Sequence, residues 1–325
     1  MAFILRRLAF YLAAFLVAAS INFALPRLMP GDPIDIMFSA AEGRIPPELR
    51  ERMAETFGFV GRPLHEEYFA YLASVFTWDL GVSIRFYPLP VADVLAAALP
   101  WTVFLAGTSA LLAFVVGSLI GVNAAWRRGT RFDAIATPAA LVAQSIPPVV
   151  IALTLLFVFG VTLQWLPTGY AYAPALDPGL DVGFVASVGY HAAMPLATLI
   201  LASLGGYLIT MRNNMIGQLG EDHVAMATAK GLSDRRVRYN YAARNALLPS
   251  VTAFALTLGH VLGGALVAEV VFNYPGLGNL LYLGILARDY PLIQGQLLIM
   301  TLAILAANLL VDFLIVVLDP RLRRG

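Results

Sequence analysis

The stretch VLAAALPWTVFLAGTSALLAFVVGSLIGVNAAW, residues 94–126, is a run of 33 residues without a charged side chain. A helix needs about 20 apolar residues to cross the hydrocarbon core of a bilayer, so this run is long enough for one span. Five more uncharged runs lie at 8–26, 134–176, 182–211, 245–268 and 290–311. Together the six runs predict an all-α integral membrane protein with six transmembrane helices.

The composition of the whole chain also indicates a membrane protein. Of its 325 residues, 59% are hydrophobic and 13% are charged, whereas soluble domains average about 45–50% apolar and about 25% charged residues. This excess of apolar surface needs the bilayer as a second solvent, which argues against a soluble enzyme. The chain has no cysteine and a net charge of +1, so it can form no disulfide and carries no strong positive field for nucleic acid.

The sequence also lacks the motifs of a phosphate-binding loop and of a metal site. The only lysine, Lys230, is followed by Gly231, whereas a phosphate-binding loop requires Gly-Lys followed by Ser or Thr. The four histidines do not have the spacing of metal ligands. We therefore expect a protein that is not an enzyme and has no catalytic, cofactor-binding or metal-binding residues.

The distribution of basic residues predicts the orientation in the membrane. Fourteen of the 21 Lys and Arg residues fall on the side of the N-terminus if six spans are present, and positive charge favours the cytoplasmic side. Both termini are therefore predicted to be cytoplasmic. The expected organisation is a tail and first transmembrane helix at 1–29, an extracytoplasmic segment at 30–96, and a five-helix core at 97–325. Arg6 and Arg7 before an apolar run are also typical of a signal peptide, but we favour an uncleaved first span.

The inner loop at 212–248 differs from the other connections because it is charged and has a helical pattern. It contains EDHVAMATAKGLS at 221–233, with acids at the start and Lys230 at the end, as the helix dipole favours. Gly231 fits a position of positive φ just after a helix, and Ser233 fits the N-cap of a second helix that we expect to end before Pro249. Two interpretations are open: a solvated loop whose arginines hold lipid headgroups, or a docking element for a cytoplasmic partner.

This loop resembles the EAA signature loop of ABC-importer permeases. The copy departs from the general pattern, since Ala225 stands six positions before Gly231 in place of Glu and Met226 takes the first Ala position. It is more similar to the oligopeptide, dipeptide and nickel permease subfamily, which it matches in AxAKGLS and RNALLP. Further segments resemble the B-type subunit of that subfamily: residues 30–33 (PGDP), 79–81 (DLG), 272–278 (FNYPGLG), 288–291 (RDYP) and 318–323 (LDPRLR).

The resemblance implies a type I-like ABC importer permease fold in a bacterial inner or plasma membrane. It implies three kinds of partner besides the lipid bilayer: a second homologous permease, two ATPase subunits that bind ATP and Mg²⁺, and an extracytoplasmic solute-binding protein. Peptides are the implied substrate, with oligosaccharides or nickel as alternatives. A secondary transporter is the alternative from a different class.

The same resemblance implies that residues 221–232 form a coupling helix that rests in a groove of an ATPase subunit. Small residues there would permit close backbone contact. The implied coupling residues are Glu221, Asp222, His223, Ala225, Ala227, Ala229, Lys230, Gly231, Leu232 and Arg235.

Three further features give candidates for the transport pathway or for packing. A Pro-Pro pair breaks the third run, and beside this break lie Gln144, Ser145 and Pro147. Broken helices often line transport paths, so these residues are candidates for the pathway. A simple kink in the helix is the alternative. Glu269, at the outer end of the fifth predicted span, either lines an outer gate or caps the turn that follows. Gly117 and Gly121 have the spacing for close helix contact, which we expect within this chain rather than in a dimer seam.

Overall fold

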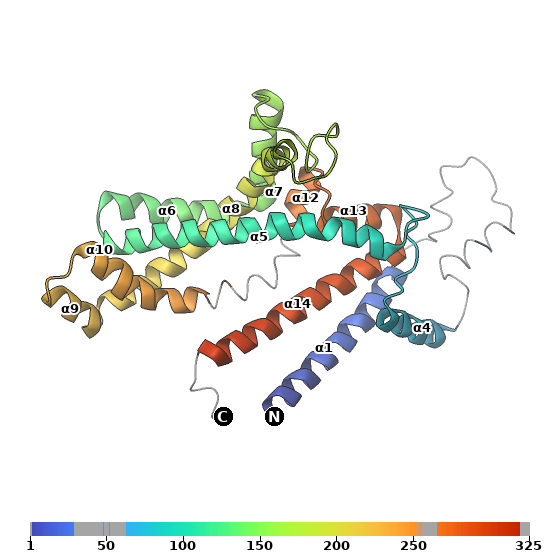
Figure 1. Ribbon diagram of the computed structural model, residues 1–325, viewed down its shortest axis with the longest axis horizontal. Helices are drawn as coiled ribbons and strands as arrows, with labels where there is room; N and C mark the ends of the chain where they lie inside the picture. Colours follow the sequence, from blue (N-terminus) through green and yellow to red (C-terminus); the bar gives the residue numbers. More distant parts are fainter. Residues whose placement is uncertain are drawn as a thin grey trace. The chain divides into compact units, whose positions relative to one another are not determined.

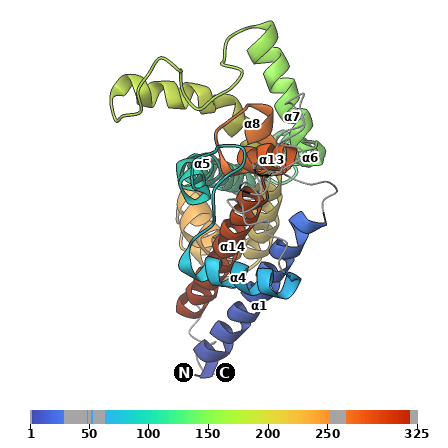
Figure 2. The same cartoon turned by 90° about the vertical axis from the view of Figure 1, so that its right-hand side faces the viewer.

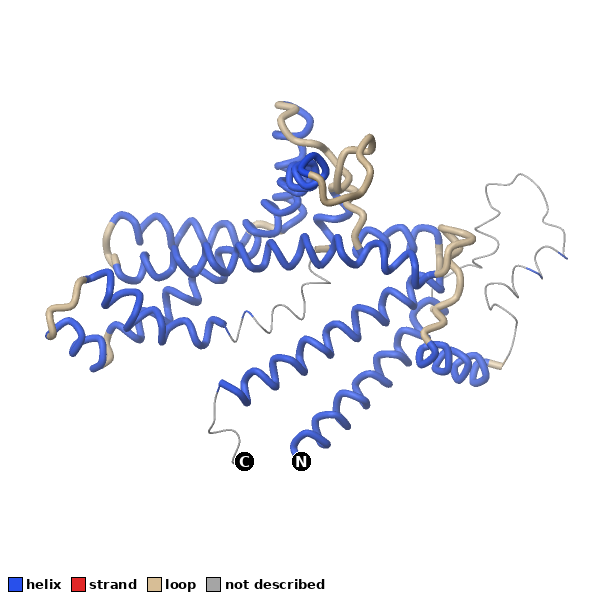
Figure 3. Tube along the Cα trace, viewed as in Figure 1, coloured by secondary structure: helices blue, strands red, loops and turns tan. Residues whose placement is uncertain are grey.

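The computed structural model describes residues 2–28, 48, 52, 63–251, 254 and 265–318. Within these ranges the regular secondary structure is helical, apart from an isolated bridge between Val82 and Pro90 (Figure 3). The chain divides into two compact units, residues 1–101 with 275–306 and residues 102–274 with 307–325. Two of the three boundaries between the units fall inside long helices, α5 (Val91–Trp126) and α14 (Tyr290–Leu318), and the third follows Tyr274. The all-α prediction is confirmed for the described residues.

Several helices are apolar enough to belong in a bilayer. In the described part of the chain, α5 and α8 (Val182–Leu219) are each long and apolar enough to cross a membrane. The segments Arg131–Ser145 and Pro148–Thr162 make a third candidate if they form one broken span. Shorter apolar helical stretches occur at Ala9–Leu25, Leu277–Ala287 and Tyr290–Ala306. Half of the predicted run at 245–268 lies outside the described residues.

The first unit contains α1 (Ala2–Arg27), α4 (Leu64–Thr77) and α13 (Leu277–Ala287), with the adjoining parts of α5 and α14. Its centre is Asp289, which is fully buried at the N-cap of α14. Oδ1 of Asp289 accepts a hydrogen bond from Leu292 N at 3.0 Å, and Oδ2 accepts one from Arg85 N at 2.9 Å and another from the Ser83 hydroxyl. Asp289 therefore joins the segment before α5 to the start of α14.

The second unit is built from short and long helices around α8. Its helices are the remainder of α5, α6 (Arg131–Ser145), α7 (Pro148–Leu155), the π-helix η1 (Leu156–Thr162), α8, α9 (Asp222–Ala229), α10 (Asp234–Arg236), the π-helix η2 (Val237–Ala243) and α12 (Leu266–Val271). The unit also contains the helical residues 244–251 and the remainder of α14. α6 packs along α8, and α7 turns away from α6 by 96° (Figure 1). The predicted break at the Pro-Pro pair is thus confirmed, while both halves remain helical.

Two glycines of α5 allow it to lie directly against α8. A Cβ atom at Gly117 would stand 2.8 Å from the Leu204 carbonyl oxygen, and one at Gly121 would stand 2.5 Å from the Leu208 carbonyl oxygen. Backbone contact this close is what the small-xxx-small spacing permits. The predicted packing within this chain is confirmed for this pair, whereas the second such pair, at 259 and 263, lies outside the described residues.

Gly121→Ala is expected to destabilise the protein, because the new methyl group would force α5 away from the backbone of α8. Overpacking of this kind costs about 1–3 kcal/mol. Gly107→Ala is the matched control: it lies in the same helix, and a Cβ atom there would meet nothing within 4 Å. Thermal denaturation of the two purified variants in detergent measures the difference, and equal midpoints would contradict the packing role of Gly121.

Two predicted helix ends are wrong. The fourth run was expected to end at Met211, yet α8 continues to Leu219; it continues because Arg212 is neutralised by an ion pair and Met215 is buried. The basic helix was expected to end before Pro249, yet the chain is helical from 244 to 251. Prolines also lie inside α5, α6 and α8, as is common in membrane helices, where neighbouring groups and local π-turns bond the freed carbonyls.

Candidate functional site

The predicted coupling helix exists as α9, and one of its faces belongs to the hydrophobic core. Val224 and Ala227 of α9 are buried together with Met211 and Met215 of α8 and Val237 of η2. Figure 1 shows α9 and α10 beside the ends of α5 and α8. α9 is therefore a fixed part of the second unit and not a solvated loop.

Gly231 supplies the turn that ends α9. Its φ is +71°, and its N–H donates to the Thr228 carbonyl at 2.9 Å, while Lys230 N donates to the Met226 carbonyl at 3.0 Å. The prediction of positive φ at Gly231 is confirmed. Ser233 occupies the N-cap position of α10 as predicted, although its hydroxyl makes no capping hydrogen bond.

The opposite face of α9 is exposed and almost flat. Asp222, Ala225, Met226 and Ala229 are all exposed, and they share one side of the helix because they recur at spacings of three and four. Met226 is 58% exposed and is the large apolar side chain of this face. Glu221, Lys230, Gly231 and Arg235 extend the exposed surface at the two ends. We call the face formed by Asp222, Ala225, Met226 and Ala229 the α9 face.

Not every predicted coupling residue lies on the α9 face. Ala227 is only 2% exposed, so the expectation that it contacts a partner is corrected: its small side chain lets α9 pack against the chain's own core. His223 and Leu232 are half-buried. The His223 ring nitrogen Nε2 lies 3.0 Å from Asn245 Nδ2, which links α9 to the helix after η2.

A cluster that was not predicted from the sequence ties η2 to α5. Arg238 Nη1 donates to Asn123 Oδ1 at 2.9 Å, and the guanidinium carbon lies 4.9 Å from the centre of the Trp126 ring. The Tyr239 hydroxyl lies 3.3 Å from the same Asn123 oxygen. A displacement of α9 and η2 would therefore pull on the end of α5.

A buried ion pair ties α6 to α8 near the same end of the unit. Arg212 Nε lies 2.7 Å from Asp133 Oδ1, and Arg212 Nη2 lies 2.9 Å from Asp133 Oδ2. Asp133 Oδ1 also accepts a hydrogen bond from Thr137 Oγ1 at 2.9 Å, and Oδ2 accepts one from Gly129 N at 3.3 Å. The two residues are 79 positions apart, and no motif near either of them indicates its partner. The sequence therefore did not predict this ion pair.

A groove of about 630 Å³ opens between α9 and the helical segment that follows η2. Its lining includes His223, Arg236 and Arg244 and contains no acidic residue. The surface beside α9 is therefore basic and rich in hydrogen-bond donors.

The pathway candidates lie at two places in the second unit. Gln144, Ser145 and Pro147 are exposed at the bend between α6 and α7, and the Ser145 hydroxyl donates to the Leu141 carbonyl at 2.8 Å. Gln144 lies over Gly205, where an added Cβ would come within 3.1 Å of the Gln144 Cβ.

Glu269 is fully buried in α12. Its Oε1 accepts a hydrogen bond from Thr102 Oγ1 at 2.7 Å, and its backbone carbonyl accepts one from Tyr274 N at 2.8 Å. The loop before α8 closes over this turn, because Tyr170 N donates to the Phe272 carbonyl at 3.2 Å. In this conformation Glu269 joins α12 to α5 and does not face open solvent.

The chain is similar to known proteins over nearly its whole length. Residues 113–324 match the family described as binding-protein-dependent transport system inner membrane component. The dipeptide transport system permease protein DppB of Escherichia coli (strain K12) is 33% identical over 99% of this chain and 98% of its own length. The oligopeptide transport system permease protein AppB of Bacillus subtilis (strain 168) is 31% identical over 99% of both chains.

Proposed function

Because this chain belongs to the family of binding-protein-dependent transport system inner membrane components, we propose that it is a permease subunit of an ATP-driven ABC importer for peptides. The names of the two relatives specify dipeptides or oligopeptides, which favours peptides over oligosaccharides or nickel. A solute-binding protein outside the cell would deliver the peptide. A second, homologous permease would complete the translocation pathway.

The observation that carries this proposal is the position of α9. Its Val224 and Ala227 are fixed in a core shared with α8, and Arg238 holds the adjacent η2 on α5. The α9 face is exposed. A partner that binds and moves the α9 face would therefore move the ends of two long apolar helices. Such coupling of a partner's state to a bistable membrane unit is what an importer requires.

ATP and Mg²⁺ would bind to two separate ATPase subunits. When ATP closes the ATPase pair, the α9 helices of the two permeases would approach each other, and the pathway would open outward. The ATPase subunits would be identical or homologous. This chain would contribute no catalytic group to hydrolysis.

The proposed topology has six spans with both termini in the cytoplasm. The apolar helices α5 and α8 and the bent pair of α6 with α7 and η1 support three of the spans. The apolar stretches of α1 and α14 support two more. The run at 245–268 supplies the sixth.

Affinity purification of this chain from its native membrane tests the proposal. We expect a second permease and ATPase subunits to copurify, identified by mass spectrometry. Cells that lack the gene should also lose uptake of a labelled, hydrolysis-resistant dipeptide, while uptake of an oligosaccharide and of Ni²⁺ is unchanged. A chain that emerges alone and transports solute in liposomes without ATP would instead indicate a secondary transporter. If the cells instead lose oligosaccharide or Ni²⁺ uptake and keep peptide uptake, the importer function would stand, and its substrate would be the oligosaccharide or Ni²⁺.

A further inference from the structure

Helix α4 (Leu64–Thr77) has three distinct faces, one of which packs against α1. Arg27 Nη2 is 2.9 Å from Glu67 Oε2, and the Ser20 hydroxyl is 2.7 Å from the Tyr68 hydroxyl. Val75 is buried about two turns further along. Figure 2 shows α4 crossing α1.

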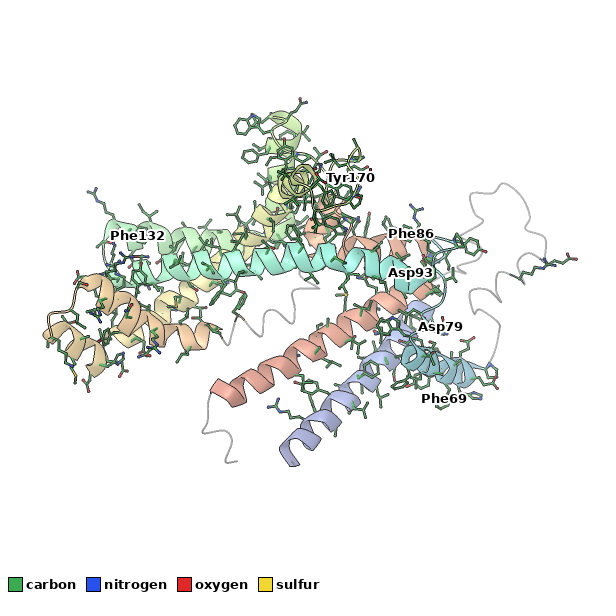
Figure 4. All side chains as sticks on the ribbon, in the orientation of Figure 1. Phe69, Asp79, Phe86, Asp93, Phe132 and Tyr170 are labelled. Atoms are coloured by element: carbon green, nitrogen blue, oxygen red, sulfur yellow. The ribbon has the colours of Figure 1, made fainter. Side chains whose placement is uncertain are left out.

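The second face is apolar and largely exposed. It consists of Phe69, Leu72, Ala73 and Phe76, which recur at spacings of three and four and so share one side of the helix. Leu72 is half-buried, and the other three are exposed. Phe69 and Phe76 are 66% and 69% exposed, and Figure 4 shows the Phe69 side chain projecting outward from α4. Trp78, 50% exposed, follows directly after the helix. We call the four helical residues the α4 apolar face.

The third face is polar or small, and its centre lies about 100° around the helix from the centre of the α4 apolar face. It includes Glu66, Ala70, Ser74 and Thr77. The Ser74 hydroxyl donates to the Tyr71 carbonyl at 2.8 Å, and the Thr77 hydroxyl donates to the Ala73 carbonyl at 3.0 Å. The hydroxyls of the last turn are therefore satisfied within the helix and need no water, as a position near hydrocarbon requires.

The contacts with α1 show the direction in which the α4 apolar face points. The N-terminal end of α4 meets Arg27, the charged residue that ends the apolar run of α1. The Phe76 ring at the other end lies 6.3 Å from the Phe15 ring, twelve residues earlier in the run. Because α1 rises about 1.5 Å per residue, Phe76 reaches well into the apolar stretch of α1.

From this geometry we propose that α4 is an amphipathic helix that slopes into the bilayer from the Arg27 end of α1 and places its apolar face against acyl chains. The Arg27–Glu67 ion pair lies at headgroup level, and Phe76 lies deeper than Phe69. Amphipathic helices with aromatic residues on the apolar face bind bilayers through that face. Helix α4 is then a membrane-bound anchor rather than a helix surrounded by water.

Lipid is the occupant because the exposed surface of α1 has the same character. Val17, Ile21 and Leu25 of α1 are 60%, 53% and 44% exposed, so the apolar stretch of α1 itself needs acyl chains around it. The α4 apolar face belongs to a helix that packs on this stretch, and Trp78 is of the type enriched at membrane interfaces. This inference depends on the membrane location of the family and not on the transported substrate.

A pair of single-cysteine variants tests the inference, since the chain has no cysteine of its own. Ala73→Cys lies on the α4 apolar face and Ala70→Cys on the polar face, and both alanines are exposed. The measurement uses native membrane vesicles in the orientation in which Ala70→Cys reacts with a membrane-impermeant maleimide. In these vesicles the maleimide should modify Ala73→Cys at least about tenfold more slowly than Ala70→Cys. The reaction is read on the band of this chain after denaturation, so cysteines of other subunits do not interfere.

A second measurement separates lipid from a protein partner. Nitroxides at the two positions in the reconstituted full chain should be accessible to O₂ at 73 and to a water-soluble nickel chelate at 70. Equal maleimide rates at the two positions would overturn the inference, because the apolar face would then lie in water. Protection of position 73 in native membranes, combined with access to the nickel chelate in the reconstituted chain, would also overturn it by indicating that another subunit covers the face.

Discussion

Asp133→Ala is expected to lower the free energy of unfolding by about 3 kcal/mol, because it leaves Arg212 without its counter-charge in a largely buried position. The Asp133 and Arg212 side chains are 9% and 18% exposed. The change also removes the acceptor for Thr137 Oγ1 and Gly129 N. The midpoint of thermal denaturation of the purified protein should fall by roughly 5–10 °C.

Asp93→Ala is the matched control for this change. Asp93, labelled in Figure 4, is the third residue of α5 as Asp133 is the third residue of α6, but Asp93 is exposed. Both substitutions remove a carboxylate from a first helical turn, where it is worth less than about 1 kcal/mol at an exposed site. The difference between the two therefore isolates the ion pair. The double variant Asp133→Ala with Arg212→Met should regain part of the lost stability, because it removes the unpaired charge. An equal loss of stability in Asp93→Ala and in Asp133→Ala would contradict the role of the ion pair.

The sequence predicted well the helices whose length and apolar character are required by the bilayer. Uncharged runs at 94–126 and 182–211 became the helical cores of α5 and α8, because backbone groups in hydrocarbon must bond within their own segment. Local chemistry was equally informative at Gly231, where positive φ is required after a helix, and at the Pro-Pro pair that breaks α6 from α7. Each of these signals lies within a few residues of its effect.

The elements that the sequence did not predict depend on partners far along the chain. α8 extends past Met211 because Asp133, 79 residues earlier, neutralises Arg212. Ala227 and Ala229 look equivalent in the sequence, yet one is in the core and the other is exposed, because the orientation of α9 is set by Met215 and η2. Pairing across the fold leaves no local pattern, so the direction of a side chain and the end of a charged helix both escaped prediction.

Met226→Glu is expected to release the ATPase subunits from this chain and to abolish most peptide uptake. Met226 is the large apolar side chain of the α9 face, with the small Ala225 and Ala229 beside it. A hot-spot side chain at the centre of an interface contributes about 2 kcal/mol or more to binding, which corresponds to about 30-fold in affinity. A carboxylate at the same position would add the cost of burying an unpaired charge. Copurification of ATPase subunits with the tagged chain measures the effect directly.

Two further variants make the test specific to the α9 face. Met226→Leu keeps the volume and apolar character of the side chain, so it should retain the ATPase subunits. Leu180→Glu introduces the same charge at a site that is 98% exposed, in the loop before α8 on the opposite side of the proposed topology, and it should also retain them.

Because Met226 makes no contribution to the buried core of the second unit, its loss should leave thermal stability unchanged. Release of the ATPases together with unchanged stability would therefore separate docking from folding. Full retention of ATPases and uptake in Met226→Glu would instead show that the partner binds elsewhere. The basic groove at Arg236 and Arg244 would then be the next surface to test.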